Sequence, residues 1–145
     1  MTEEQAKGID MKMSHIGIAV RDINGAVQFF KEKFGLEATD RGTGGGFHVA
    51  FVPTGGSPIE LIQDVSPGGI ITRFIEKRGE GVHHLSFEVD DIRSALGKME
   101  AQGIHCLNKD PREGAHHSLV AFLNPKDTFG VLIELVEFPK KGDKQ

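Results

Sequence analysis

The stretch that decides the fold occurs twice in the chain. Residues 15–23 read HIGIAVRDI and residues 84–92 read HLSFEVDDI, so His15 aligns with His84 at a separation of 69 residues (84 − 15). In both copies bulky apolar residues alternate with other residues over six positions, as in a β-strand with one buried face. An aspartate then precedes apolar residues at helical spacing. The chain therefore reads as two copies of one unit.

The similarity continues beyond the predicted helices. Ala50–Val52 matches Ala121–Leu123, and the run IELI at 59–62 matches IELV at 133–136. A glycine suited to a left-handed helix end follows each helix, Gly35 in the first copy and Gly103 in the second. Each copy predicts the order β-α-β-β-β, with strands expected at residues 15–20, 36–40, 47–53 and 59–63, and again at 84–89, 104–107, 118–123 and 131–138.

We therefore expect an α+β fold in which two β-α-β-β-β repeats form a curved, mostly antiparallel sheet around a central site. The repeats cover residues 13–64 and 82–138. A segment at 65–81, punctuated by proline and glycine, joins them and contains a short helical turn at 71–77. Residues 1–145 then form a single domain, because a repeat of about 70 residues would bury little of its sheet alone.

The composition excludes several classes of function. The formal net charge is −4 and no basic stripe is present, which argues against a nucleic-acid partner. The chain has 1 Cys, so no intrachain disulfide can form. No apolar run approaches the roughly 18 residues that span a membrane. The polar segment Met1–Asp10 has no signal-peptide core, and we expect a protein without membrane contact that is cytoplasmic, or in a matrix after processing.

The repeat singles out four polar residues at equivalent positions, His15 with His84 and Glu60 with Glu134. A single histidine on a strand is more often a hydrogen-bonded core residue than a ligand. Glu134 is harder to explain in this way, because it lies in the apolar run 131–136 and a carboxylate is costly to bury unpaired. Two imidazoles and two carboxylates suit a divalent metal ion, so the four residues predict a metal site.

Other histidines carry weaker signals. Alternation puts His83 on the face of Leu85 and Phe87, which favours a structural role. His48 follows the glycine run 44–46 and is in phase with Ala50, so it is a candidate acid or base that could face a shared cavity. His116 and His117 lie in a glycine-containing loop, where they contact either substrate or solvent. The glycine run lacks the Lys-Ser/Thr of a phosphate loop and reads as a hairpin or rim loop.

The paired units, with His, Glu, His and Glu at equivalent strand positions, resemble the vicinal oxygen chelate superfamily, also called the glyoxalase/bleomycin resistance/dioxygenase superfamily. The resemblance covers roughly residues 13–138. Within the superfamily, three segments look most like methylmalonyl-CoA epimerases: residues 74–84 (FIEKRGEGVHH), 87–92 (FEVDDI) and 122–135 (FLNPK through GVLIEL).

This resemblance implies that His15, Glu60, His84 and Glu134 bind one divalent ion, which could be Co²⁺, Zn²⁺, Ni²⁺, Mn²⁺ or Mg²⁺. Some family members place glutamine where Glu60 stands. The implied reaction interconverts (R)- and (S)-methylmalonyl-CoA through removal and return of the C2 proton. Glu134 is implied as one acid/base, and His48 is a candidate for the second. The implied partners are an acyl-CoA substrate and, in a homodimer, a second copy of the chain.

Two alternatives follow from the same resemblance. A glyoxalase I (lactoylglutathione lyase) would use a similar metal site to isomerise a glutathione hemithioacetal. A non-catalytic small-molecule-binding protein would represent a different class, although such relatives generally lack the full metal quartet. The segment at 42–46 and the pair His116 and His117, both candidate substrate contacts, depart from the epimerase pattern.

Overall fold

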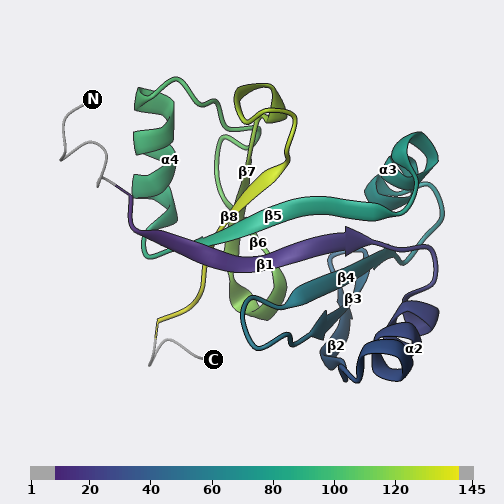
Figure 1. Cartoon of the computed structure of the whole chain (residues 1–145). Helices are drawn as coiled ribbons and strands as arrows, with labels where there is room; N and C mark the ends of the chain where they lie inside the picture. The colour runs from purple at the N-terminus through teal and green to yellow at the C-terminus, as the bar shows by residue number, and fades with distance from the viewer. Residues whose placement is uncertain (1–8, 141–145) are drawn as a thin grey trace. The chain divides into compact units, whose positions relative to one another are not determined.

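The computed structural model describes residues 9–140, so our expectations for residues 1–8 and 141–145 lie outside the described part (Figure 1). The chain divides into two compact units. One unit is His15–His84, and the other combines Met1–Ser14 with Leu85–Gln145. The units meet along the chain at two points. One lies between Ser14 and His15, within strand β1 (Met11–Ala19), and the other lies between His84 and Leu85, within strand β5 (Gly81–Val89).

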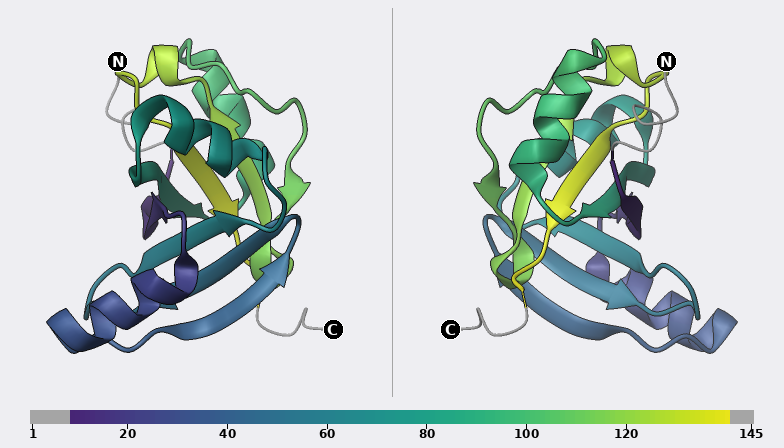
Figure 2. Two further views of the ribbon diagram at one scale, coloured as in Figure 1. Left: turned by 90° about the vertical axis from the view of Figure 1, so that its right-hand side faces the viewer. Right: turned by 90° about the vertical axis from the view of Figure 1, so that its left-hand side faces the viewer.

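The His15–His84 unit contains the first repeat. Its strands lie in the order β2-β3-β4-β1, with β1 parallel to β4 and the other neighbours antiparallel. Helix α2 packs across β3 and β4, and Figure 2 shows it lying along these strands. After β1, the elements of this unit are α2 (Ile23–Phe34), β2 (Thr39–Gly44), β3 (Phe47–Val52), β4 (Ile59–Asp64) and α3 (Ile70–Arg78).

Alternation along β1 and β4 separates two apolar faces in this unit. Leu61 and the apolar residues of β3 that share its face, Ala50 and Val52, pack with helix α2. Ala19 and Ile62 lie on the opposite face, where helix α3 adds its own buried residues. The second face is also the face of His15 and Gly17, which alternate with Ile16 and Ile18.

The other unit contains the second repeat with the same topology. Its strands lie in the order β5-β8-β7-β6, with β5 parallel to β8. Helix α4 packs on β7 and β8 through a core that includes Ile92, Leu96 and Leu135. After β5, the elements are α4 (Ile92–Ala101), β6 (Arg112–Glu113), the 3-10 turn η1 (Ala115–His117), β7 (Leu119–Leu123), the 3-10 turn η2 (Pro125–Asp127) and β8 (Ile133–Glu137).

The predicted α+β class and both β-α-β-β-β repeats are confirmed, whereas the bounds of one strand in each repeat were predicted wrongly. In the first repeat β2 begins at Thr39 rather than residue 36, because Leu36 and Ala38 pack against the core beneath α2. Strand β2 then continues to Gly44, which pairs with Phe47. Gly45 (φ 62°) and Gly46 (φ 91°) form the two-residue hairpin turn, whose positive φ angles glycine adopts without strain.

In the second repeat, the segment 104–107 forms only an isolated bridge between Cys106 and Leu123, and the outer strand is the short β6. Two backbone hydrogen bonds make this bridge, from the N–H of Leu107 to Phe122 and from the N–H of Asn124 to His105, and side chains bind other backbone groups of the segment. Asp127 accepts from the N–H of His105, and Glu100 accepts from the N–H of Cys106.

Across residues 9–140, no helix has the length and apolar character needed to cross a bilayer.

Candidate metal centre

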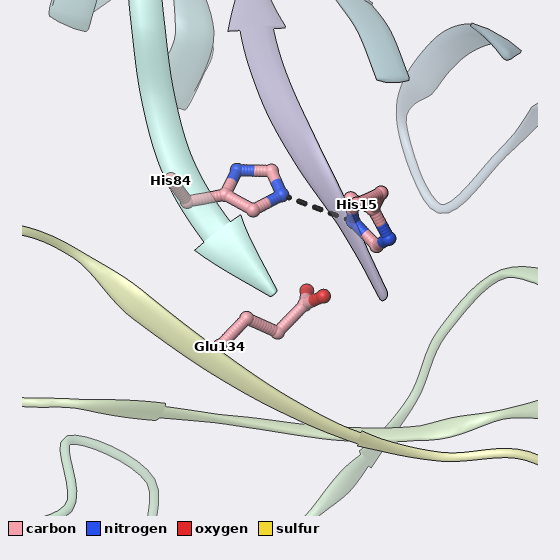
Figure 3. A group of neighbouring side chains, drawn as sticks. All are labelled: His15, His84 and Glu134. Carbon is pink, nitrogen blue, oxygen red and sulfur yellow. Dashed lines mark hydrogen bonds between the residues drawn. The ribbon is translucent and has the colours of Figure 1, made fainter. Parts of the chain in front are cut away.

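Three of the four predicted ligands converge within the His15–His84 unit. The Nε2 atoms of His15 and His84 lie 3.3 Å apart, joined by the dashed line in Figure 3. The Oε1 atom of Glu60 lies 3.3 Å from Nε2 of His84 and 3.5 Å from Nε2 of His15. The exposed fractions are only 7%, 3% and 8% for His15, His84 and Glu60. Strands β1, β5 and β4 each contribute one of these residues.

The spacing of the three donor atoms fits a shared cation. Zinc binds histidine nitrogen and carboxylate oxygen at about 2.0–2.2 Å, and in a tetrahedral site such bonds place the donor atoms about 3.4 Å apart. The three observed separations are 3.3, 3.3 and 3.5 Å. Imidazole nitrogen and carboxylate oxygen are also the donor types that first-row divalent ions accept. The residues present therefore fit the metal that the sequence resemblance implies.

Gly17 makes room for this cluster. It pairs with Glu60 in the parallel register of β1 and β4. A Cβ atom built on Gly17 would overlap the imidazole ring of His84. The ring of His84 therefore occupies the space that a side chain at position 17 would fill. Phe51 closes another side through an edge-to-face contact with His15, with ring centroids 5.6 Å apart.

Burial and mutual contact set the charge state of the cluster. Burial lowers the pKa of His15, the nearby Glu60 carboxylate partly opposes this shift, and His84 adds to it. Burial alone would raise the pKa of Glu60. The hydrogen bond from His84 and the charges of His15, His84 and His83 outweigh burial and leave that pKa below its ordinary value. An ionised glutamate beside neutral imidazoles is the form that binds a cation.

His83, which the sequence assigns to a structural role, contacts a predicted ligand. Its Nδ1 atom lies 2.9 Å from Nδ1 of His84, and its ring packs edge-to-face on Phe74 with centroids 4.9 Å apart. Burial lowers the pKa of His83 to about 4, and the neighbouring His84 contributes in the same direction. A hydrogen bond on Nδ1 of His84 fixes the ring orientation and leaves Nε2 to face the other donor atoms.

The fourth predicted ligand, Glu134, belongs to the other unit. It lies on β8 and is 8% exposed, and Figure 3 draws its side chain together with those of His15 and His84. Ser86 of β5 stands opposite Glu134 in the parallel register and donates a hydrogen bond from Oγ to Oε1 at 2.6 Å. Glu134 therefore has a polar partner within its own unit, as a buried carboxylate requires.

His48 does not join the cluster of the His15–His84 unit. It lies on β3, where alternation puts it with Ala50 and Val52 on the face that packs against α2. Phe51, which contacts His15, lies on the opposite face. The Nδ1 atom of His48 is 2.8 Å from the hydroxyl of Thr43. This position argues against His48 as an acid or base beside the three donor atoms.

His116 and His117 are exposed in η1 with left-handed backbone angles, φ 57° and 60°. His117 lies 3.7 Å from Glu113. Two consecutive non-glycine residues in this conformation carry strain, which a binding loop can retain. Sequence reasoning missed the contact of Ser86 with Glu134, although the repeat aligns Ser86 with Gly17. It also missed the bond between His83 and His84, because strand alternation alone separates neighbouring side chains.

Comparison with known proteins agrees with this architecture. Residues 14–122 match the Glyoxalase/Bleomycin resistance protein/Dioxygenase superfamily. An uncharacterized protein of Bacillus subtilis, YqjC, is 34% identical over 135 residues, which cover 92% of this chain and 95% of that protein. The ethylmalonyl-CoA/methylmalonyl-CoA epimerase of Cereibacter sphaeroides is 34% identical over 128 residues, covering 86% of this chain and 96% of that enzyme.

A solved structure extends the comparison to the fold. A variant of methylmalonyl-CoA epimerase from Streptomyces coelicolor, in complex with 2-nitronate-propionyl-CoA, is 30% identical and gives a TM-score of 0.82. The match covers 92% of this chain and 97% of that one. The chain therefore belongs to the glyoxalase/bleomycin resistance/dioxygenase superfamily, and relatives within it are named methylmalonyl-CoA epimerases. The resemblance predicted from the repeats is confirmed.

Proposed function

We propose that this chain is a metal-dependent epimerase that interconverts (R)- and (S)-methylmalonyl-CoA by removing and returning the proton on C2. The observation that carries the proposal is the convergence of His15, His84 and Glu60, whose donor atoms lie 3.3–3.5 Å apart in a buried cluster. The names of the relatives support the substrate class, because they include an epimerase that acts on methylmalonyl-CoA and one structure that contains an acyl-CoA analogue.

The proposed ligands are His15, Glu60, His84 and Glu134. The strand register supports Glu134, because Glu134 stands opposite Ser86 as Glu60 stands opposite Gly17 in the other repeat. A divalent cation held by these residues would supply Lewis-acid stabilisation for the negative charge that develops on the substrate oxygens. The donor set accepts Zn²⁺, Co²⁺, Ni²⁺, Mn²⁺ or Mg²⁺.

The proton transfer then needs two groups of this chain. A carboxylate accepts the C2 proton while the C–H electron pair moves into the thioester carbonyl, and a proton returns to the other face of C2. We assign the first role to Glu134. For the second role, Glu60 replaces His48 as our candidate, because Glu60 is the repeat-related carboxylate and its side chain lies beside His15 and His84.

Deuterium exchange tests the proposal directly. Enantiopure methylmalonyl-CoA in D₂O with the metal-loaded protein should racemise and gain deuterium at C2, and chelation of the metal should stop both processes. Glu134→Gln should abolish exchange. Glu60→Gln should slow exchange on one face, whereas the matched substitution His48→Gln should leave the rate within about twofold. Absence of both racemisation and deuterium uptake in the wild-type protein would end the epimerase proposal.

One feature favours a glyoxalase I activity as the second candidate. Glu60 stands where some epimerases have glutamine, so both repeat-related positions carry a carboxylate. Formation of a thioester from the glutathione–methylglyoxal hemithioacetal, without exchange of methylmalonyl-CoA, would establish this alternative. A protein that binds no divalent ion and turns over neither substrate would instead be a non-catalytic binding protein.

We further propose that the two repeats act together as a single domain and that the chain forms a homodimer in the cytoplasm. The repeated topology supports the first point, because each unit contributes residues of the proposed ligand set. Sedimentation of the purified protein tests the second point, and a monomer at micromolar concentration would contradict it.

A further inference from the structure

The two repeats differ at one pair of equivalent positions, Gly17 and Ser86. Both residues follow a predicted histidine ligand by two positions, and both stand opposite a glutamate in a parallel register. At position 17 the His84 ring fills the side-chain space. At position 86 a hydroxymethyl group is present, fully buried, and donates to Glu134.

The hydrogen bond between Ser86 and Glu134 has the length of a strong, charge-assisted bond. Its Oγ–Oε1 distance of 2.6 Å falls in the range of about 2.5–2.7 Å for a hydroxyl that donates to a carboxylate. Ser86 is buried with 0% exposed surface, and its strand position is fixed by pairing with β8. The hydroxyl can therefore hold one oxygen of Glu134 and so restrict rotation of the carboxylate plane.

Glu60 obtains its orientation in a different way. Its Oε1 atom contacts the imidazoles of His15 and His84 within the same unit, and its opposite residue, Gly17, has no side chain to offer. The repeat therefore contains two glutamates in equivalent strand positions with different partners. One glutamate contacts two histidines, and the other accepts a hydrogen bond from a serine.

We propose that Ser86 is a positioning residue that fixes the carboxylate orientation of Glu134 for metal binding and proton transfer. This inference rests on the proposed function for the role of Glu134, but the contact itself does not. Loss of a hydrogen-bonding partner of a metal ligand typically costs about 10–100-fold in metal affinity or activity. Because Ser86 is 0% exposed and so has no surface to offer a substrate, the loss should fall on kcat and leave KM within about twofold.

The test compares Ser86→Ala with Ser86→Thr and Ser86→Cys. Removal of the donor in Ser86→Ala should lower kcat for C2 exchange by about 10–100-fold, weaken Co²⁺ binding or both, and change the visible absorption of the Co²⁺-loaded protein. Ser86→Thr keeps a hydroxyl and should restore most of the rate. A thiol is only a weak donor, so Ser86→Cys should give an intermediate value. Ile92→Val, a buried change in α4, controls for lost stability and should retain the wild-type rate and spectrum.

Two results would overturn the role of Ser86. One is a Ser86→Ala protein with wild-type kcat, Co²⁺ affinity and Co²⁺ spectrum. The other applies if Ser86→Ala does not fold. It is the same kcat, Co²⁺ affinity and Co²⁺ spectrum in Ser86→Thr and Ser86→Cys. The Co²⁺ measurements need no substrate. A wild-type protein without exchange activity, combined with a Co²⁺ spectrum that depends on Ser86, would therefore refute the epimerase proposal and support the positioning role.

Discussion

Gly17 lies against the imidazole of His84, so closely that a Cβ atom at position 17 would overlap the ring. The backbone of β1 at Gly17 and the ring of His84 on β5 thus lie in direct contact, with no side chain between them. Glycine is needed at position 17 because the His84 ring fills the side-chain space. The backbone conformation does not require it, since Gly17 is not among the residues with positive φ. This contact gives the first prediction.

Gly17→Ala should displace the His84 ring and weaken Co²⁺ or Zn²⁺ binding by about 10–100-fold, as measured by calorimetric titration. Gly97→Ala in helix α4 is the matched control, because a Cβ at Gly97 meets no atom within 4 Å. The control should bind metal normally and gain about 0.4–1 kcal/mol of stability. Equal metal affinity in both variants would show that the ring tolerates the displacement.

His83 should support metal binding through the ring of His84. His83→Phe keeps an aromatic ring against Phe74 but removes the 2.9 Å contact with Nδ1 of His84, so metal affinity should fall by about tenfold or more. His83→Asn places a polar atom near the former Nδ1 position and should recover part of the affinity. If His83→Phe binds metal as the wild-type protein does, the contact has no orienting role.

Asp64 should stabilise helix α3 in a pH-dependent way. Its carboxylate accepts from the backbone N–H and hydroxyl of Thr72, at 2.6 and 2.7 Å, and from the N–H of Ile71 at 3.4 Å. Burial alone would raise the pKa of Asp64. The hydrogen bonds and the charge of Arg73 outweigh burial, so the folded-state pKa lies below the ordinary value.

Because that pKa is lowered on folding, the stabilisation is complete above the unfolded-state pKa of about 3.9 and is lost as pH falls through the lower folded-state pKa. Asp64→Ala should cost about 0.5–2 kcal/mol at pH 7, measured by urea unfolding, and the difference should shrink in acid. Asp22, the N-cap of α2, makes no side-chain capping bond, so Asp22→Ala should change stability by less than about 0.5 kcal/mol. Equal losses from the two substitutions would refute the capping role of Asp64.

Cys106 should react slowly with thiol reagents. Burial, together with the neighbouring Glu100 carboxylate, raises the pKa of its thiol to about 11. Only about one thousandth of the thiol is then ionised at pH 8, and the thiolate is the reactive form. Labelling with a chromogenic disulfide should accelerate nearly tenfold per pH unit above pH 8, and Glu100→Gln should increase the rate at fixed pH. Rapid labelling at pH 7 would contradict this pKa.

Sequence periodicity was sufficient to predict the position of a residue where that position depends on strand alternation and on the repeat. It placed His15 and His84 on equivalent strands, and it placed Glu60 and Glu134 on equivalent strands of the two repeats. It failed where backbone pairing is limited to one bridge and side chains bind the neighbouring backbone groups. Residues 104–107 have a β-like composition, yet the side chain of Asn108 accepts from the N–H of Phe122, so a side-chain oxygen occupies a position on the edge of β7 that a further strand would use.

The acid/base role predicted for His48 stays a prediction, and the position of His48 on β3 argues against it for a related reason. Alternation correctly put His48 in phase with Ala50, but the sequence did not show which face of β3 lies beside the histidines. The choice of face depends on where α2 packs, and that packing involves residues far apart in the chain. The role of Ser86 was missed because a serine on a strand has no distinctive pattern until its opposite residue is known.

The difference between Gly17 and Ser86 also bears on how such a duplicated chain can change over evolutionary time. A protein assembled from two identical copies of the first repeat would carry glycine at both positions and would lack the hydroxyl that binds Glu134. Two copies of the second repeat would place a hydroxymethyl group where the His84 ring must lie. The halves have thus become non-interchangeable, and recombination that swaps one for the other should be selected against.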